Sequence, residues 1–193
     1  MILGILSDTH GQGRAASAAL AVLRRAGAEA FVHCGDVGGT AVLDELAGSQ
    51  AWFVRGNTDE PGPMVFEYGR SLGLGVPTEV PLRIEVDGRT LIVFHGHELR
   101  FSWLLDLLHA GKTDKLQSAL NGVDYVLSGH THAPHDVRVG SVRFINPGAI
   151  YRARVPSVAT LDLGHDVLRF WEVNPERGGR EPALRELSPE RLV

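Results

Sequence analysis

The chain of 193 residues has one cysteine, no block of basic residues and no long apolar segment. The lone Cys34 cannot close an internal disulfide, which favours a reducing compartment. The apolar start of the chain reaches only Leu6 before it meets Asp8, and no other window approaches the length of a membrane span. The net charge is −4, without the clustered Lys and Arg that follow a nucleic-acid backbone. We therefore expect a cytoplasmic protein without membrane or long nucleic-acid partners.

The rest of the composition is that of an ordinary globular protein. Hydrophobic residues make up 44% and charged residues 22% of the chain, which argues against disorder and against fibrous repeats. The length suits one compact domain, and the sequence shows no internal repeat or long linker. We therefore expect a single domain over residues 1–193, in which residues 174–193, rich in Arg, Glu and Pro, form a C-terminal tail.

Strands and helices are expected to alternate in the first third of the chain. Apolar runs predict strands at 2–6, 30–34 and 52–54. Apolar residues at helical spacing predict a helix over 13–26, which ends in two arginines and a glycine, and a second helix covers 40–47. This order of elements predicts parallel strands joined by right-handed crossovers.

The pattern changes after residue 80. Apolar and polar residues alternate over 82–86, and a second apolar run covers 90–94, so these two segments predict an antiparallel pair. Helical spacing then begins at Phe101 and continues through Leu120, before a further strand at 125–127. Hairpin turns are expected at Asp87-Gly88, Gly140-Ser141 and Gly164-His165.

Five apolar runs are followed at once by polar residues that can bind ligands. The polar stretches are Asp8-Thr9-His10, Gly35-Asp36, Gly56-Asn57-Thr58-Asp59, His95-Gly96-His97 and Gly129-His130-Thr131-His132. In open α/β sheets the carboxyl ends of the strands form the ligand-binding edge. One site can therefore collect all five loops.

The residue types in these loops predict a metal site. Carboxylates, imidazoles and one carboxamide, without a thiolate, suit hard and borderline divalent ions. Seven such side chains exceed the needs of one ion. Two ions about 3.5 to 4 Å apart that share a carboxylate would use all of them, and this arrangement serves phosphoryl hydrolysis.

These five stretches and Asn146-Pro147-Gly148 appear in the order found in calcineurin-like metallophosphoesterases. The chain resembles most closely the small bacterial and archaeal branch of phosphodiesterases, the YfcE/MJ0936-like proteins. The resemblance extends from residue 1 to about residue 173. It implies an α/β fold in which two mixed sheets are flanked by helices, a four-layer α/β/β/α sandwich.

The resemblance also implies the ligands of two ions. One ion is held by Asp8, His10 and His132, the other by Asn57, His95 and His130, and Asp36 bridges them. Manganese is the usual activating ion of the family, with magnesium, iron, nickel or zinc as alternatives. A hydroxide between the ions would attack a small phosphate ester, most often a diester.

The stretch around Thr58 departs from the wider family, which has a histidine at this position. A threonine cannot act as a general acid at neutral pH, so His97 is our candidate for phosphate contact or proton donation. We assign catalytic roles to His97, Asp36 and Asn57. We expect Asp59 to orient a site residue rather than to bind a metal.

Several residues near these stretches have structural interpretations. We expect His33 to pack in the core and the buried thiol of Cys34 to be inert. Isolated glycines such as Gly56 are ordinary turn residues unless a close approach requires them, and Asn146-Pro147-Gly148 is either a simple turn or a segment that shapes the site through its backbone.

An alternative function is a non-catalytic, metal-binding interaction protein of the same fold, similar to a retromer subunit. The sequence leaves open whether the chain forms a homo-oligomer and which phosphate ester it hydrolyses.

Overall fold

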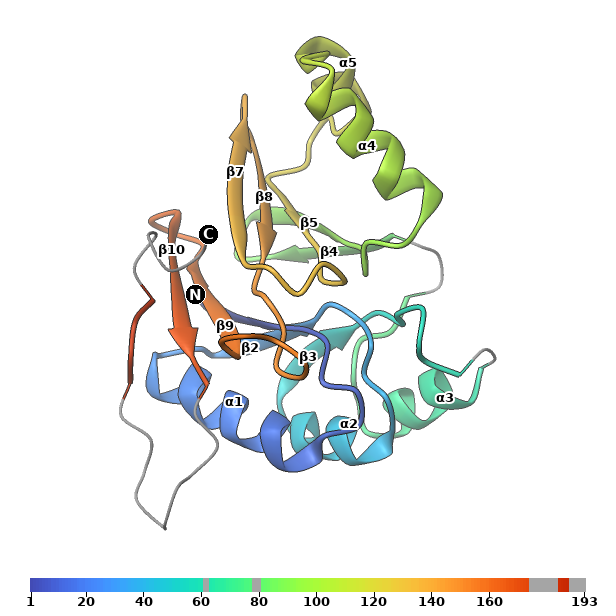
Figure 1. Ribbon diagram of the computed structural model, residues 1–193, viewed down its shortest axis with the longest axis vertical. Coiled ribbons are helices and arrows are strands. Elements are labelled where there is room, and N and C mark those ends of the chain that lie inside the picture. Colours follow the sequence, from blue (N-terminus) through green and yellow to red (C-terminus); the bar gives the residue numbers. More distant parts are fainter. Residues whose placement is uncertain (61–62, 78–80, 174–183, 188–193) are drawn as a thin grey trace.

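Two sheets lie face to face between two layers of helices in the computed structural model, which describes residues 1–60, 63–77, 81–173 and 184–187. Helices α1, α2 and α3 form the lower layer in Figure 1, and helices α4 and α5 form the upper layer. The expected α/β/β/α sandwich is confirmed. Among the described residues, no helix combines the length and the apolar character that crossing a membrane requires.

The first sheet has the strand order β10-β9-β1-β2-β3. Its strands are β1 (Ile2–Leu6), β2 (Ala30–His33), β3 (Gln50–Phe53), β9 (Ser157–Asp162) and β10 (Val167–Glu172). β1, β2 and β3 are parallel, as predicted, whereas β9 runs antiparallel to both β1 and β10. The carboxyl ends of the three parallel strands therefore lie at one end of the sandwich.

Three helices cover the outer face of this sheet: α1 (Gly13–Arg25), α2 (Thr40–Leu46) and α3 (Met64–Ser71). The helices at 13–26 and 40–47 are confirmed within one residue, and Ala16, Leu20 and Leu23 of α1 are buried. No sequence pattern predicted α3. Gly69 is its one buried residue, and its apolar side chains Val65, Phe66 and Tyr68 are only partly buried against the core.

The second sheet has the order β4-β5-β6-β8-β7. Its strands are β4 (Leu82–Val86), β5 (Arg89–Val93), β6 (Tyr125–Leu127), β7 (His135–Val139) and β8 (Val142–Asn146). The antiparallel hairpins β4–β5 and β7–β8 are confirmed, while β6 is parallel to β5 and to β8. β5 and β6 thus end on the same side of this sheet.

Two helices rather than one cover the second sheet, α4 (Leu99–His109) and α5 (Thr113–Ala119). The expected continuous helical segment is interrupted at Gly111, whose φ is +64°. A left-handed glycine ends a helix because it lets the last carbonyls bond to following amides. The amides of Gly111 and Lys112 indeed donate to the carbonyls of Leu108 and Leu107.

Three apolar cores hold these layers together. The core between the sheets includes Leu3 and Ile5 of β1 and Leu91 of β5, and each of these side chains is fully buried. A second core joins the first sheet to α1, α2 and α3. A third joins the second sheet to α4 and α5. Because both faces of each sheet are covered, the strands are rigid supports for the loops that follow them.

Both edges of the first sheet are bordered by short segments outside its strands. On β10, the amide of Glu172 donates to the carbonyl of Arg185, and the amide of Leu187 donates to the carbonyl of Phe170. On β3, Gly75 accepts from the amide of Phe53 and donates to the carbonyl of Ala51. Of the expected tail, 184–187 therefore lies against β10, while 174–183 and 188–193 fall outside the described residues. The single-domain assignment stays a prediction.

Candidate metal centre

The loops after five strands meet at one end of the sandwich. Asp8 follows β1, Asp36 follows β2 and Asn57 follows β3, while His95 and His130 follow β5 and β6 of the second sheet. Backbone hydrogen bonds join the loops within each sheet: the amide of Asp8 donates to the carbonyl of Gly35, and that of Gly129 to the carbonyl of His95. The predicted convergence of the five loops is confirmed.

Most of the expected ligands have an unusual backbone conformation. Left-handed φ values between 46° and 69° occur at Asp8, His10, Asp36, His130 and His132. For residues other than glycine this conformation costs on the order of 1–3 kcal/mol and persists only where the surroundings impose it. Such backbone strain is typical of functional sites, where it aims side chains at a common point.

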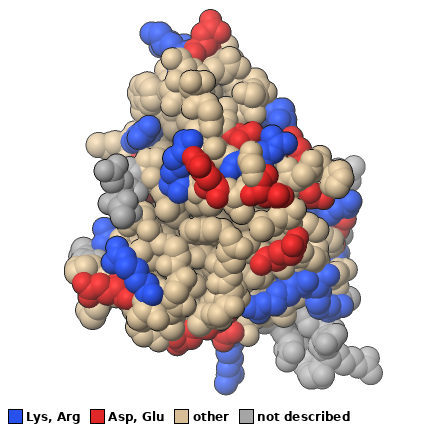
Figure 2. Space-filling model, turned by 180° about the vertical axis from the view of Figure 1, so that it is seen from behind, with Lys and Arg blue, Asp and Glu red and all other residues tan. Residues whose placement is uncertain are grey.

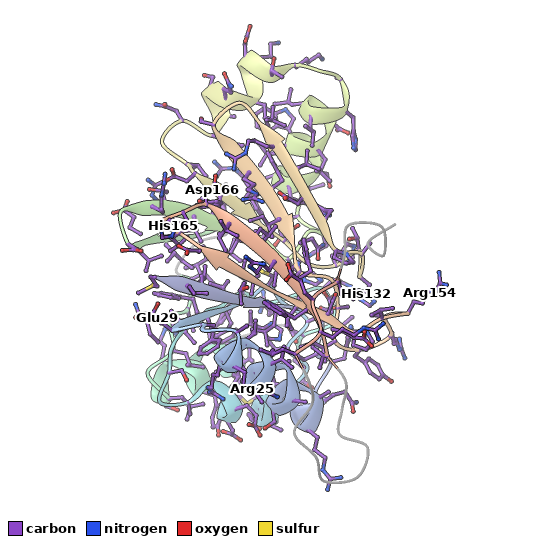
Figure 3. All side chains as sticks on the ribbon, turned by 90° about the vertical axis from the view of Figure 1, so that its left-hand side faces the viewer. Arg25, Glu29, His132, Arg154, His165 and Asp166 are labelled. Carbon is purple, nitrogen blue, oxygen red and sulfur yellow. The ribbon has the colours of Figure 1, made fainter. Side chains whose placement is uncertain are left out.

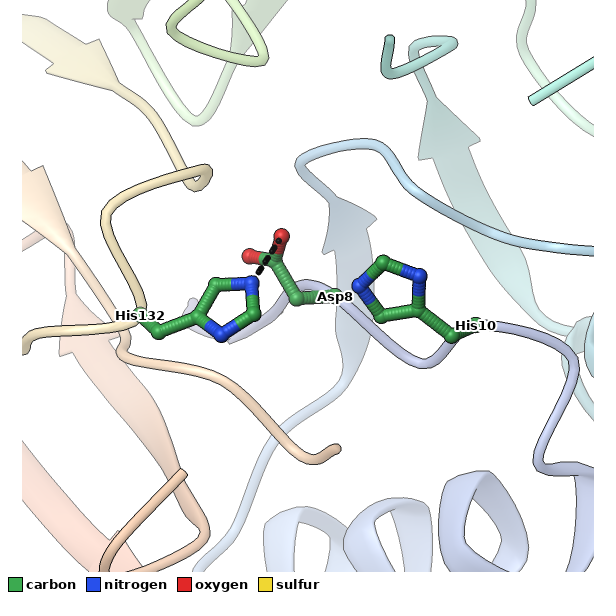
Figure 4. Close-up of side chains that lie close together, drawn as sticks. All are labelled: Asp8, His10 and His132. Atoms are coloured by element: carbon green, nitrogen blue, oxygen red, sulfur yellow. Dashed lines mark ion pairs between the residues drawn. The ribbon is translucent and has the colours of Figure 1, made fainter. Parts of the chain in front are cut away.

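The first cluster of possible ligands contains Asp8, His10 and His132 (Figure 4), whose donor atoms lie within 4.8 Å of one another. Asp8 Oδ1 is 3.2 Å from His132 Nε2. His10 lies on the opposite side of Asp8 from His132 in this view. The structure thus brings together the three residues that the resemblance assigns to one ion.

The second cluster contains Asp8, Asp36 and His95, again within 4.8 Å. His95 Nε2 is 3.0 Å from Asn57 Oδ1, and the rings of His95 and His130 are 5.1 Å apart, so the remaining two expected ligands adjoin this cluster. Asp36 Oδ1 is 3.5 Å from His95 Nε2, and its Oδ2 is 3.5 Å from His10 Nε2. The Asp36 carboxylate therefore lies between the two clusters.

The electrostatics of the clusters favour a negative Asp36. Burial raises the pKa of this carboxyl, but the hydrogen bonds from His95 and from the Thr58 amide outweigh burial and hold the pKa well below its usual range. Burial lowers the pKa of His95, yet Asp36 and the Cys34 carbonyl raise it overall. The pKa of His130 is lowered by burial and by the neighbouring His95. The anionic Asp36 is a suitable metal ligand, whereas a metal ion at His95 would have to displace the proton that Asp36 and the Cys34 carbonyl favour there.

Unpartnered buried atoms show that these residues fit metal ions. Asp8 Oδ1 and His10 Nε2 are buried and make no hydrogen bond with the described residues. Buried polar atoms are almost always paired, and one left alone costs about 1–3 kcal/mol. A divalent cation would satisfy the carboxylate oxygen and the imidazole nitrogen at once. The mixed oxygen and nitrogen donors suit ions such as manganese, iron or zinc.

Asp59 fixes the backbone of two of these loops. Its carboxylate accepts hydrogen bonds from the amides of Val37 (3.1 Å), Gly38 (2.6 Å) and Gly56 (2.7 Å). The loop that carries Asp36 is thereby tied to the loop that carries Asn57. The expectation that Asp59 orients the site is confirmed, although it acts on the backbone rather than on a ligand side chain.

His33 is buried, as expected, and connects the first two loops. Its Nδ1 accepts from the amide of Gly35, and its Nε2 is 2.9 Å from Thr9 Oγ1, which donates to the carbonyl of Val37. Burial and the nearby His95 lower the pKa of His33 to about 3, so the imidazole is neutral.

Cys34 contributes through its backbone rather than its thiol. Its carbonyl accepts from His95 Nδ1 at 2.8 Å, an interaction that directs Nε2 towards Asp36. Burial raises the pKa of the thiol, which keeps it protonated. The side chain is therefore inert, as the sequence indicated.

Glu98 is a supporting residue that the sequence reasoning missed. Its two carboxylate oxygens accept from the amides of His95 (2.8 Å) and Gly96 (2.7 Å), which holds the loop after β5. The available signal was an acidic residue three positions before Phe101, where the predicted helical spacing begins.

Asn146 supports the loop after β6. Its side-chain amide donates to the carbonyl of Gly129 and to Thr131 Oγ1, so Asn146 shapes the site through its side chain.

Glycines at three turns leave room for ligand side chains. A Cβ atom at Gly56 would lie 2.0 Å from Asp36 Oδ1, one at Gly129 would lie 2.8 Å from Asp8 Oδ2, and one at Gly35 would lie 2.6 Å from His95 Nδ1. Each distance is shorter than a van der Waals contact. These glycines are therefore required by the packing of the site and are not ordinary turn residues.

The remaining candidates lie at the rim of the site or far from it. Thr58 Oγ1 is 3.3 Å from His10 Nδ1. His97 is 38% exposed, and its ring lies 6.3 Å from that of His130. Figure 3 shows His165, an exposed residue of the turn between β9 and β10, well separated from His132.

The architecture is shared with solved structures of other proteins. A solved archaeal phosphodiesterase superimposes with a TM-score of 0.73 and 24% identity, covering 89% of this chain and 99% of that one. Vps29 from Entamoeba histolytica in complex with zinc gives a TM-score of 0.57 and 19% identity, covering 89% and 91%. These likenesses show the fold.

The sequence itself gives the family. Residues 1–166 match the calcineurin-like phosphoesterase superfamily domain, and the chain belongs to this superfamily. Phosphodiesterase MJ0936 from Methanocaldococcus jannaschii is 26% identical over 166 residues, which are 84% of this chain and 93% of that protein. The predicted family resemblance is confirmed.

Proposed function

We propose that the protein hydrolyses a small phosphate ester, most readily a phosphodiester, with two divalent metal ions as cofactors. The observation that carries this proposal is the position of Asp36 between two clusters of nitrogen and oxygen donors. The similarity to a protein named as a phosphodiesterase supports the same reaction.

The proposed ligands are those that the resemblance implies: Asp8, His10, Asp36, Asn57, His95, His130 and His132. Bound ions would supply an activated hydroxide near neutral pH and would neutralise the phosphate oxygens. The chain's own contribution is to hold these donors rigidly through Asp59 and Glu98.

Manganese is our first choice of ion, and magnesium, iron, nickel and zinc are alternatives. The donors are imidazoles, carboxylates and one carboxamide, which suit all of these ions to different degrees. The preference for manganese comes from the family resemblance.

His97 is the proposed contact to the phosphate or to the leaving group. Its exposure of 38% leaves it accessible to substrate, and its ring is 5.5 Å from that of His95. Thr58 is instead engaged with the ligands, because its amide donates to Asp36 Oδ1.

A small substrate agrees with the charge distribution. On the face shown in Figure 2, basic and acidic side chains lie close to one another around an area with few charges. Such a mixed surface does not follow a polyanionic backbone. We therefore propose a small phosphate ester in a cytoplasmic setting, and no long nucleic acid.

The test is an assay of metal-free and metal-loaded protein on bis(p-nitrophenyl) phosphate. We expect turnover with manganese and none after chelation. Calorimetry on the same samples measures metal binding independently of turnover. Full metal binding without turnover of any phosphate ester would contradict the proposal and would support the alternative of a non-catalytic, Vps29-like interaction protein.

A further inference from the structure

A pocket of about 370 Å³ opens beside the proposed metal centre. Pockets that bind small molecules have volumes of roughly 300–1,000 Å³, so this one can hold an organic group of moderate size. It lies between the start of α2, the loop after β3 and helix α3. We call it the side pocket; the lining residues used below are Thr40, Thr58, Glu60, Met64, Val65 and Tyr68.

Thr58 joins the side pocket to the metal centre. Its amide donates to Asp36 Oδ1 at 2.9 Å, and its hydroxyl is 3.3 Å from His10 Nδ1. The same residue lines the pocket. A phosphate held by metal ions beside Asp36 would therefore have the pocket next to it, open to a group that is esterified to that phosphate.

The walls of the side pocket are largely apolar. Met64 and Val65 of α3 contribute aliphatic side chains, and Tyr68 contributes an aromatic ring. The hydroxyl of Tyr68 donates to Asp44 Oδ1 at 2.6 Å, which fixes the orientation of the ring. Met64 is 71% exposed, and an exposed apolar side chain at the rim of a concave site favours contact with an apolar ligand.

The charges of the side pocket exclude a second phosphate. Two of its lining residues are acidic, Asp59 and Glu60, and none of its described lining residues is Lys or Arg. The Asp59 carboxylate is already bonded to three backbone amides, which makes it a rigid part of the wall. Glu60 adds an exposed negative charge. An anionic group would be repelled, whereas an uncharged group would not.

We propose that the side pocket binds the uncharged, apolar or aromatic group of the phosphate ester. This inference rests on the proposed function, because it assumes that the phosphate lies at the metal centre. It names the substrate class: esters that carry a single phosphate group and a planar or apolar organic substituent, as opposed to polyphosphates and sugar phosphates.

The experiment compares two phosphonates whose carbon–phosphorus bonds the reaction cannot cleave. Benzylphosphonate and methylphosphonate have the same charged group, and only the first carries an aromatic ring. Each is titrated calorimetrically into the full-length, manganese-loaded protein. Burial of most of a phenyl ring predicts that benzylphosphonate binds about fivefold or more tightly than methylphosphonate.

Two matched tryptophan variants locate the ring. Thr40 is the exposed first residue of α2 and lines the side pocket, so Thr40→Trp should fill it. Thr113 is the exposed first residue of α5, in the opposite helical layer of Figure 1. Thr40→Trp should lower the preference for benzylphosphonate to less than about twofold without changing methylphosphonate affinity, whereas Thr113→Trp should keep the wild-type preference.

A second variant, Met64→Ala, removes an exposed wall of the pocket and should lower the preference by about twofold. It serves as the test if Thr40→Trp does not fold. Equal affinities of wild-type protein for the two phosphonates, or a preference that survives both pocket variants, would overturn the inference. Tight benzylphosphonate binding without any turnover of bis(p-nitrophenyl) phosphate would instead contradict the proposed function, and failure of both phosphonates to bind would contradict both.

Discussion

The two ends of the β-sandwich use the same backbone conformation for different purposes. Left-handed aspartates occur at the metal centre, Asp8 and Asp36, and at the hairpins of the opposite end, Asp87 and Asp166. At the hairpin end the charges are paired: Asp87 lies 2.7 Å from the terminal ammonium of Met1, and Asp166 bonds to two arginines and to a tyrosine. At the metal end, Asp8 Oδ1 is buried without a hydrogen bond. The hairpin end pairs its carboxylates with ammonium and guanidinium groups, whereas the metal end surrounds them with imidazoles and leaves Asp8 Oδ1 without a hydrogen bond.

The largest expected effect is on catalysis, from Asp36→Ala. Residues that only orient a metal ligand cost about 10- to 100-fold when removed, so losing the carboxylate between the clusters should lower kcat/KM by more than about a hundredfold. Asp87→Ala is the matched control, because it removes a left-handed aspartate at the hairpin end. Activity of the control should stay within about twofold of wild type. Equal activities of the two variants would contradict the assignment of the metal centre.

The second prediction compares two glycines, Gly56 and Gly88. A Cβ at Gly56 would lie 2.0 Å from Asp36 Oδ1, whereas one at Gly88 meets no atom within 4 Å. We expect Gly56→Ala to displace the carboxylate and to lower metal affinity and kcat/KM by about 10- to 100-fold. Gly88→Ala should affect stability alone, by about 1 kcal/mol, because its φ is +71°.

Calorimetry with manganese and a chemical unfolding curve separate these two effects. Loss of stability without loss of metal affinity in Gly56→Ala would show that the glycine serves the fold rather than the site.

The third prediction concerns the pH dependence of stability. The folded protein holds the pKa of His33 at about 3, and the value in the unfolded chain is near 6.5. Below pH 6.5 the unfolded chain therefore binds a proton at His33 that the folded protein does not bind. The free energy of unfolding should fall by about 1.4 kcal/mol per pH unit from this residue as the pH decreases from 6.5 towards 3.

His33→Gln should remove this part of the slope, measured by urea unfolding at several pH values. His109→Gln is the control, because His109 is an exposed residue at the end of α4. If the slope of the free energy of unfolding against pH changes equally in both variants, the claim that His33 is buried and neutral in the folded protein is contradicted.

The smallest effects are expected from two carboxylate replacements in the metal-free protein. Asp8→Asn removes a buried charge whose Oδ1 makes no hydrogen bond among the described residues, and should raise the free energy of unfolding by about 1 kcal/mol, at the expense of metal affinity. Asp166→Asn weakens the interactions of this carboxyl group with Arg138, Arg143 and Tyr125. It should lower the free energy of unfolding by about 1 kcal/mol. If the free energy of unfolding changes in the same direction in both variants, the contrast between the carboxylates of the metal end and those of the hairpin end is refuted.

Much of the fold was predictable because it depends on local patterns. The apolar runs of β1, β2 and β3 and the stripe of α1 gave these elements within a few residues. Helix α3 was not predictable, because its one buried residue is Gly69 and its position is set by tertiary contacts. The break between α4 and α5 was equally hidden, since a glycine in an apolar pattern does not reveal its φ.

The members of the candidate site were predictable for a different reason: carboxylates and imidazoles followed directly after apolar runs. The convergence of the Asp8 and Asp36 loops follows from parallel strand order. The supporting residues were less visible. Glu98 and Asn146 act on backbone groups of loops that only the folded chain brings near them. The pairing of His33 with Thr9 likewise depends on the register between β1 and β2.

The segments along β10 and β3 have a consequence for self-association. An exposed strand at the border of a sheet is a template on which another chain can add a strand, and proteins commonly cover it to prevent aggregation. Arg185 and Leu187 bond to β10, and Gly75 bonds to β3, so both borders already carry partners. A second copy of the chain would have to displace these segments before it could pair with β10 at Phe170 and Glu172, or with β3 at Ala51 and Phe53.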